Sequence, residues 1–421
     1  AKYGELFPEY NKYCGRPLRL NKSMYGMIHS GRFWWEELSE WLFSNGFTSS
    51  SVHPCLLWKT TGTHVVMLLN YVDDMLYFGT STTIEGTFVK ELTTRFKAEI
   101  MGQAHWFLSL RITQGADYSI TIDQSRYAKA ITLRYTDKVN THMKDHYNRT
   151  LPPDWIASKN DCTTSPDDSA MLEKFYNINY RSCTGALIYL HFTRPDIVFA
   201  VMKLVKFNNN PGKIHFEALI FLLGYLRDNP YLGIKFYSNI ADAPVTQLLR
   251  SQNITPSSNF YSFSDSSWQD CPTSGRSTGS YLIFYQGGVV DHSSFVPTPV
   301  AMSSGEAEYN AACTTCMATA HIRMLINEIT TLNDTDPSDQ PPVTIILDND
   351  AAISMSKSLK DTKRNRHIDR CIHYVRNRVR AGKHALSYIP AEFQLADTGT
   401  KNLDFIDASP RFKYSMITVD D

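Results

Sequence analysis

The sequence of 421 residues has no long apolar run, and none approaches the roughly 20 consecutive apolar residues that a membrane-spanning helix needs. The first residues, Ala1 to Glu5, also lack the apolar segment of a signal peptide. Hydrophobic residues make up 43% of the chain and charged residues 20%, which is typical of a globular protein. We therefore expect a protein without a membrane partner.

Cysteine is sparse, since the eight cysteines are scattered and only Cys313 and Cys316 lie close together. A structural zinc site takes four ligands, which usually come as two such pairs, and no second Cys/His pair lies nearby. The alternatives are a zinc site and buried thiols, and the missing second pair favours thiols. We therefore expect an intracellular, reduced protein.

The chain has no excess charge of either sign, because 42 basic residues balance 42 acidic ones. An evenly spread zero charge would argue against a nucleic-acid-binding protein, but the charge is not evenly spread. A basic window, Lys363–Lys383, holds six arginines that only Asp369 opposes: Arg364, Arg366, Arg370, Arg376, Arg378 and Arg380. The window predicts contacts with phosphates, and a solvated helix face is the alternative.

The stretch Tyr71–Asp74 reads Tyr-Val-Asp-Asp and lies between two apolar, strand-forming runs, Val65–Leu69 and Met75–Phe78. This pattern predicts a β-hairpin with Asp73 and Asp74 at its tip. Two adjacent ionised carboxylates repel each other unless a divalent cation that prefers oxygen ligands lies between them. The stretch is therefore either a cation site or an ordinary polar turn, where aspartate is also common.

Motifs around the predicted hairpin resemble those of the Ty/copia class of retrotransposon polyproteins. Tyr-x-Asp-Asp between apolar strands is similar to the active-site hairpin of reverse transcriptases. Upstream, Ser23–Trp34 resembles the family segment S-L-Y-G-L-K-Q-A-P-R-x-W, and Asn45–Phe47 and His53–Leu56 match the family in order and approximate spacing. The resemblance implies that Asp73 and Asp74 are catalytic metal ligands.

The resemblance also implies a nucleotide pocket, made by Tyr71, Tyr25, Gly26, His29 and Arg32. Within this segment the family's K-Q-A-P has become Ile-His-Ser-Gly, which removes a glutamine expected to contact the incoming nucleotide. A polymerase palm also needs a third carboxylate, which the family carries well before S-L-Y-G. Asp73 is the first aspartate of the sequence, so we expect this ligand upstream of Ala1 and an N-terminally truncated copy.

We predict that this chain does not extend a DNA primer on an RNA template with Mg²⁺ and deoxynucleotides, because the third palm carboxylate is missing from its sequence. The measurement is the length of a labelled primer after incubation, with an Asp73→Asn variant as the control. Extension clearly above that control would contradict the prediction.

The last third of the sequence carries four acids at predicted strand ends and helix starts, in the order Asp, Glu, Asp, Asp. This order resembles the metal-binding set of the ribonuclease H fold, and the copia-type motifs S-S-x-E-A-E-Y, H-I-D and Q-L-A-D-x-x-T-K recur around it. The resemblance implies that Asp265, Glu308, Asp348 and Asp397 are catalytic metal ligands. Glu306 competes with Glu308, and the family motif around Glu308 favours the latter.

Phosphodiester hydrolysis and nucleotidyl transfer both proceed by in-line displacement, in which two Mg²⁺ ions about 3.5–4 Å apart stabilise the attacking and leaving oxygens. Clustered carboxylates suit Mg²⁺ better than histidine or cysteine, because Mg²⁺ prefers oxygen ligands. The resemblance implies two Mg²⁺ or Mn²⁺ ions per active site, with an RNA template, a DNA primer, an RNA–DNA hybrid and deoxynucleotides as partners. It also implies an upstream integrase segment and a cytoplasmic particle or the nucleus as the location.

The chain is long enough for two or three domains. We predict an α+β polymerase palm fragment with a helical thumb and connection, followed by an α/β ribonuclease H-like domain with a mixed sheet flanked by helices. The predicted ranges are 1–148 for fingers and palm, 149–175 for a linker or surface excursion, 176–250 for thumb and connection, 259–405 for the ribonuclease H-like domain and 406–421 for a tail. Three functions stay open: a polymerase with ribonuclease H activity, a hybrid nuclease alone, and a catalytically silent relic that binds nucleic acid.

Overall fold

The computed structural model describes residues 19–21, 23–24, 26–135, 149–271, 274–298, 300–333, 340–357, 369–403 and 405–420, together with Pro8 and Lys12. The chain forms two compact units, Ala1–Met101 and Gly102–Asp421. None of the described helices combines the length and the apolar character that crossing a bilayer requires.

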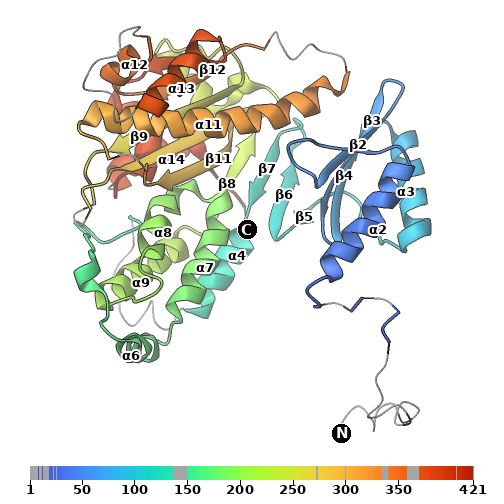
Figure 1. The fold of residues 1–421 in the computed structure, drawn as a ribbon, viewed down its shortest axis with the longest axis horizontal. Helices are drawn as coiled ribbons and strands as arrows, with labels where there is room; N and C mark the ends of the chain where they lie inside the picture. The colour runs from blue at the N-terminus through green and yellow to red at the C-terminus, as the bar shows by residue number, and fades with distance from the viewer. Residues whose placement is uncertain are drawn as a thin grey trace. The chain divides into compact units, whose positions relative to one another are not determined.

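The N-terminal unit is an antiparallel sheet with the strand order β1-β2-β3-β4, packed against two helices (Figure 1). Its elements in chain order are α2 (Ser30–Ser44), β1 (Thr48–Ser49), β2 (Leu56–Thr61), β3 (His64–Tyr71), β4 (Asp74–Gly79) and α3 (Thr82–Phe96). Apolar residues at helical spacing, Leu38 and Leu42 of α2 and Phe88 and Leu92 of α3, pack in one core with Leu68 of β3. The core therefore holds the sheet and both helices together beneath the hairpin.

The hairpin predicted around Tyr71–Asp74 is present, because β3 and β4 are antiparallel and Tyr71 pairs with Asp74. Val72 and Asp73 form the connecting turn, and Val72 has a φ of 56°, in the left-handed region. A β-branched residue rarely adopts this region, because its branched side chain crowds the backbone there. The turn that presents the two acids is therefore strained at Val72.

The C-terminal unit contains two five-stranded sheets. The first is antiparallel, with the order β14-β8-β7-β6-β5. Its strands are β5 (Trp106–Phe107), β6 (Leu110–Gln114), β7 (Ile120–Asp123), β8 (Leu232–Phe236) and β14 (Ile417–Thr418). The structure thus divides the chain after Met101 and not at the predicted residue 148, because β7 pairs with β8 through neighbours such as Ile122 and Ile234. The palm, thumb and connection assignments stay predictions.

Among the described residues, five α-helices lie in the sequence between β7 and β8 of this sheet, and we call them the helical layer. Its helices are α4 (Ser125–Arg134), α6 (Pro166–Tyr176), α7 (Tyr180–Leu190), α8 (Val198–Val205) and α9 (Lys213–Asp228). They share a core that includes Tyr176, Leu187, Val201 and Phe216. The range 176–250, which was predicted to be helical, contains α7, α8 and α9, whereas the predicted linker 149–175 contains most of α6.

An ion pair is buried between α8 and α9. Arg194 is 1% exposed, and its guanidinium donates to both carboxylate oxygens of Asp196 at 2.6–3.2 Å. The third guanidinium nitrogen donates to the carbonyl of Asn229 at 2.8 Å, and the Tyr225 hydroxyl donates to Asp196 at 2.8 Å. The motif Thr193-Arg194-Pro195-Asp196 therefore joins the start of α8 to the end of α9.

The second sheet is mixed, with the order β11-β10-β9-β12-β13. Its strands are β9 (Phe260–Ser267), β10 (Thr278–Tyr285), β11 (Gly288–Phe295), β12 (Val343–Leu347) and β13 (His384–Tyr388). The first three strands are antiparallel neighbours, whereas β12 is parallel to both β9 and β13. The mixed sheet predicted for this region is therefore present.

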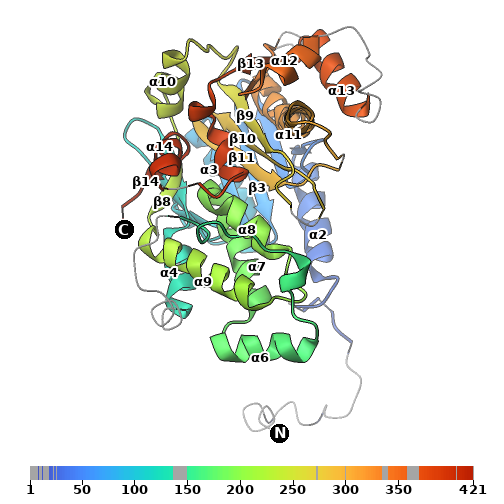
Figure 2. The ribbon, with the colours of Figure 1, turned by 90° about the vertical axis from the view of Figure 1, so that its left-hand side faces the viewer.

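Helices cover both faces of the mixed sheet (Figure 2). They are α11 (Ser304–Thr330), α12 (Asp350–Lys357) and α13 (Asp369–Arg380) on one face, and α10 (Pro244–Ser251) with the 3-10 helix η10 (Leu395–Gly399) on the other, beside α14 (Phe405–Ser415). Adjacent residues of β12 show the alternation, because Ile345 packs toward α11 and Ile346 toward α10. Cys313 and Cys316 of α11 are buried thiols, as predicted.

Candidate functional site

Two of the predicted acids meet because their strands are parallel neighbours. Ile346 of β12 pairs with Phe263 of β9. Asp348 and Asp265 each lie two residues further along these strands, so the register places the two aspartates side by side. Glu308 comes from the second turn of α11, which packs on β9.

The carboxylate cluster consists of Asp265, Glu308 and Asp348, whose oxygens lie within 4.8 Å of one another. One oxygen of Glu308 accepts a hydrogen bond from the backbone N–H of Ser266 at 3.1 Å. Its other oxygen, Oε2, is buried and has no hydrogen-bond partner in the described parts of the chain. A buried oxygen without a partner costs free energy unless a ligand satisfies it. Three carboxylates with such an oxygen are the donor set that a divalent cation takes.

Crowding raises the pKa of the acids in the carboxylate cluster. Burial, with the charges of Asp265 and Asp348, raises the pKa of Glu308 far above its ordinary value. Burial and the charge of Asp397 raise the pKa of Asp348. A bound divalent cation reverses this effect, because it neutralises the mutual repulsion of the carboxylates. The residues present therefore fit a divalent metal.

The fourth predicted ligand, Asp397, lies in η10 and is held by two cations. The Lys401 ammonium donates to one of its oxygens, and the Arg411 guanidinium donates to the other at 3.3 Å. The Thr400 hydroxyl donates to Asp265 from the same segment. Burial and the charge of Asp265 raise the pKa of Asp397. The structure thus brings Asp397 near Asp265, and also pairs it with Lys401 and Arg411.

Glu306 has a structural role at the start of α11. One of its carboxylate oxygens accepts a hydrogen bond from the backbone N–H of Met302 at 2.7 Å. Its own N–H donates to the hydroxyl of the N-cap residue Ser303 at 3.3 Å, which satisfies a backbone donor of the first turn. Glu306 therefore caps the helix that carries Glu308 into the carboxylate cluster.

Thr400, Lys401 and Arg411 were missed as site residues by the sequence analysis. Thr400 and Lys401 belong to the motif Q-L-A-D-x-x-T-K, so their position after Asp397 was a usable signal. Arg411 lies in α14, far from any motif, and only the packing of α14 beside η10 brings it to Asp397.

In the N-terminal unit, the hairpin tip exposes Tyr71, Asp73 and Asp74 to solvent. The side chain of Trp34, in the second turn of α2, donates a hydrogen bond to the carbonyl of Val72. This bond holds the start of α2 beside the turn and supports the strained Val72. The two acids are therefore presented at an open edge of the unit.

The predicted nucleotide-pocket residues lie before or at the start of α2. Tyr25 is outside the described residues, and Gly26 has a φ of 89°, which suits a residue without a side chain. His29 is the exposed N-cap residue of α2, and Arg32 pairs with Glu36 at 2.7 Å on an exposed helix surface. Their contact with a nucleotide stays a prediction.

Within the basic window, α13 turns one of the predicted phosphate contacts inward. Arg376 is 3% exposed, and its Nε donates to the carbonyl of Met355 at 3.0 Å. It lies on the helix face that carries Ile372 and Val375 into the core, so the prediction that Arg376 contacts phosphate is wrong. The burial of the side chain is the physical reason.

The other predicted contacts of the basic window divide into three groups. Arg364 and Arg366 lie outside the described residues. Arg378 is partly buried and donates to His384 Nδ1 at 3.2 Å. Arg380 ends α13 with an exposed side chain, as does Arg370 at the start of the helix.

We expect Arg380→Glu to lower the salt dependence of hybrid binding, because an exposed arginine that contacts a phosphate releases counterions, at about 0.9 per contact for a B-form duplex. Arg376→Gln should leave that slope unchanged and instead lower the melting temperature. The measurement is the affinity for an RNA–DNA hybrid at several salt concentrations. An unchanged slope in the Arg380 variant would assign Arg380 to a solvated helix face.

Comparisons with known proteins agree with these motifs. The family model for reverse transcriptase (RNA-dependent DNA polymerase) matches residues 9–152. The chain is 28% identical over 385 residues to the retrovirus-related Pol polyprotein from transposon RE1 of Arabidopsis thaliana. It is 29% identical over 388 residues to the corresponding polyprotein from transposon RE2 of the same plant. Over 91% of its length, the chain is therefore similar to Ty/copia-type retrotransposon Pol polyproteins.

Each of these Pol matches covers 91% of this chain and 24% of the relative, so the chain spans about a quarter of the length of the curated relatives it matches. Among solved structures, ribonuclease H1 from Halobacterium salinarum matches 36% of this chain and 97% of its own, with 12% identity and a TM-score of 0.24. In this chain, the range that the family model matches contains the hairpin acids, and the carboxylate cluster lies beyond that range.

Proposed function

We propose that this chain cleaves the RNA strand of an RNA–DNA hybrid, with divalent cations held by the carboxylate cluster. The observation that carries the proposal is the meeting of Asp265, Glu308 and Asp348, from three separate elements, within 4.8 Å. None of the three forms a salt bridge within the described parts of the chain. Clustered like charges without a paired counter-ion destabilise a fold, and binding of a cation compensates for that cost.

The chain's own residues orient the ligands before a substrate arrives. The Ser266 N–H fixes Glu308, and the Thr400 hydroxyl fixes Asp265. Lys401 and Arg411 hold Asp397 at the edge of the site. When bound, two Mg²⁺ or Mn²⁺ ions supply stabilisation of the attacking and leaving oxygens of the displacement. Hydrogen bonds from surrounding residues hold the carboxylate ligands in place before the reaction. The ligands therefore need not rearrange during catalysis.

The exposed hairpin tip favours a second function in the N-terminal unit. We propose that Asp73 and Asp74 belong to a polymerase site that acts on an RNA template, a DNA primer and deoxynucleotides, within a polypeptide that supplies the third palm carboxylate. Support comes from the open position of both acids beside Tyr71. The reverse transcriptase family model covers this hairpin.

The test of the nuclease uses the full chain and a labelled RNA strand in three forms: paired with DNA, paired with RNA, and single-stranded. We expect cleavage only in the hybrid and only with Mg²⁺ or Mn²⁺. Circular dichroism establishes that the chain is folded under the assay conditions. No cleavage with either metal by a folded chain would overturn the proposal in favour of a silent relic that binds nucleic acid.

A further inference from the structure

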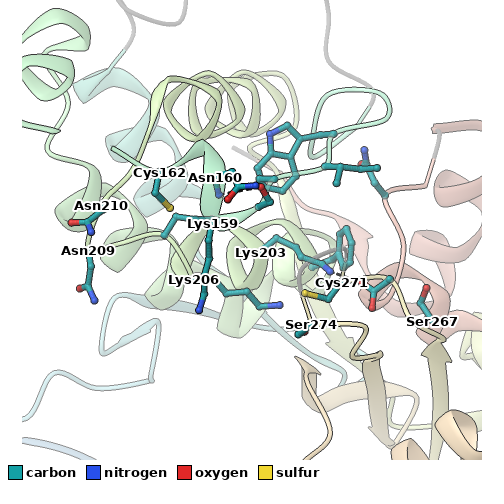
Figure 3. Close-up of a pocket in the computed structure, with 18 of the residues that line it drawn as sticks. Lys159, Asn160, Cys162, Lys203, Lys206, Asn209, Asn210, Ser267, Cys271 and Ser274 are labelled. Atoms are coloured by element: carbon teal, nitrogen blue, oxygen red, sulfur yellow. Dashed lines mark hydrogen bonds and ion pairs between the residues drawn. The ribbon is translucent and has the colours of Figure 1, made fainter. Parts of the chain in front are cut away.

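A cavity of about 1130 Å³ lies beside the carboxylate cluster within the C-terminal unit (Figure 3). Ser267, Thr400 and Lys401 line it on the side of the mixed sheet, and Thr400 and Lys401 also bind Asp265 and Asp397 of the site. The opposite wall comes from residues 155–164 and from the helical layer at residues 199–210. We call this space the lysine cavity, and it connects the candidate site to the helical layer.

The lysine cavity has an excess of positive charge, since four lysines and one aspartate line it. Lys203 is neutralised, because its ammonium binds Asp270 and Thr278. Lys401 is paired with Asp397. Two further lysines of the lysine cavity remain, Lys159 and Lys206.

Lys159 and Lys206 are the unpaired cations of the lysine cavity. Both side chains are exposed, and neither has a hydrogen bond or ion pair with the described residues. Figure 3 shows them on the helical side of the cavity, with Ser267 and Ser274 on the other side. Two unpaired ammonium groups in a concave wall attract an anion more strongly than two isolated surface lysines do.

The size and the lining of the lysine cavity favour a polymeric ligand over a small molecule. Pockets for small ligands usually measure about 300–1,000 Å³, and the lysine cavity exceeds this range. Asparagines 160, 209 and 210 add exposed amide groups to the wall, and Trp155 and Phe207 add aromatic faces. Lysine and asparagine side chains are common donors to the phosphates and sugars of nucleic acids. This combination suits a phosphodiester backbone.

We propose that the lysine cavity binds the backbone of one strand of the hybrid next to the carboxylate cluster, with Lys159 and Lys206 in contact with its phosphates. The inference rests on the proposed function, because it takes the hybrid that is cleaved at the neighbouring carboxylate cluster as the ligand of the cavity. Backbone contacts fix the position of a nucleic acid and carry no base sequence. The helical layer thereby determines which phosphate lies at the acids.

The first test compares the double variant Lys159→Gln/Lys206→Gln with a matched control, Lys174→Gln/Lys213→Gln. The control lysines are exposed on α6 and α9 and do not line the cavity. Affinity of the full chain for a hybrid is measured without divalent cations at several salt concentrations, so that no cleavage occurs. The cavity variant should lose about 0.9 in log-log slope for each broken contact, and the control should lose none. Equal slopes in both variants would overturn the proposal.

Two native cysteines give a second readout. Cys162 and Cys271 line the cavity, whereas Cys55 lies in the N-terminal unit. We expect the hybrid to slow alkylation of Cys162 and Cys271 and to leave Cys55 unchanged. Alkylation of the cavity cysteines at the same rate with and without hybrid would contradict the assignment.

The two proposals fail in distinguishable ways, because these binding tests need no cleavage. A lysine-dependent slope in a chain that does not cleave the hybrid supports the cavity and refutes the nuclease. Cleavage combined with equal slopes and unprotected cysteines refutes the cavity alone.

Discussion

Replacing Asp348 by asparagine is expected to reduce hybrid cleavage by about three orders of magnitude or more, because stabilisation of the transition state by bound cations is worth several kcal/mol. Asparagine keeps the size of the side chain and removes only the charge. Hybrid affinity should stay nearly unchanged, since contacts with phosphates supply most of it. The measurements are the single-turnover cleavage rate and the dissociation constant of the same preparation.

Asp350→Asn is the matched control for this experiment. Asp350 is exposed at the start of α12, two residues beyond Asp348 and outside the carboxylate cluster. It should retain the full cleavage rate. Because burial and Asp397 raise the pKa of Asp348, the neutral asparagine should not lower the melting temperature of the metal-free chain. Full cleavage by the Asp348 variant would remove this residue from the reaction.

The largest expected effect on stability comes from Arg194→Met, which should lower the free energy of unfolding by about 3–5 kcal/mol. The substitution leaves the Asp196 carboxylate buried, with the Tyr225 hydroxyl as its remaining side-chain donor among the described residues. It also leaves the carbonyl of Asn229 without the guanidinium. Denaturant unfolding followed by the circular dichroism of the helices measures the change.

Lys213→Met provides the comparison for a pair at the surface. Lys213 lies 3.6 Å from Glu217 on α9, with side chains that are 73% and 52% exposed. Exposed pairs of this kind contribute about 0.3–0.5 kcal/mol. If both variants lost the same small amount, Arg194 and Asp196 would not hold the helical layer together.

Local patterns in the sequence predicted the elements that local chemistry determines. The two apolar, strand-forming runs on either side of Tyr71–Asp74 predicted the hairpin that β3 and β4 form. The four acids of the C-terminal unit were found through family motifs, and the parallel pairing of β9 and β12 explains why Asp265 and Asp348 meet.

Distant pairings and burial could not be predicted in the same way. Nothing local to Ile122 indicates that it pairs with Ile234, so the predicted boundary at residue 148 differs from the observed division. Arginine is mostly exposed in proteins, and only the packing of α8, α9 and α13 reveals that Arg194 and Arg376 are buried. The lysine cavity likewise forms where four segments that are distant in the sequence come together.

Location of a bound cation tests most directly whether the carboxylate cluster is a metal site. Crystals of the full chain soaked with Mn²⁺ would show the ion as an anomalous difference peak. We predict a peak coordinated by oxygens of Asp265, Glu308 and Asp348, and its loss in crystals of the Asp348→Asn variant. Mn²⁺ peaks elsewhere with none at these three acids would contradict the proposed nuclease site.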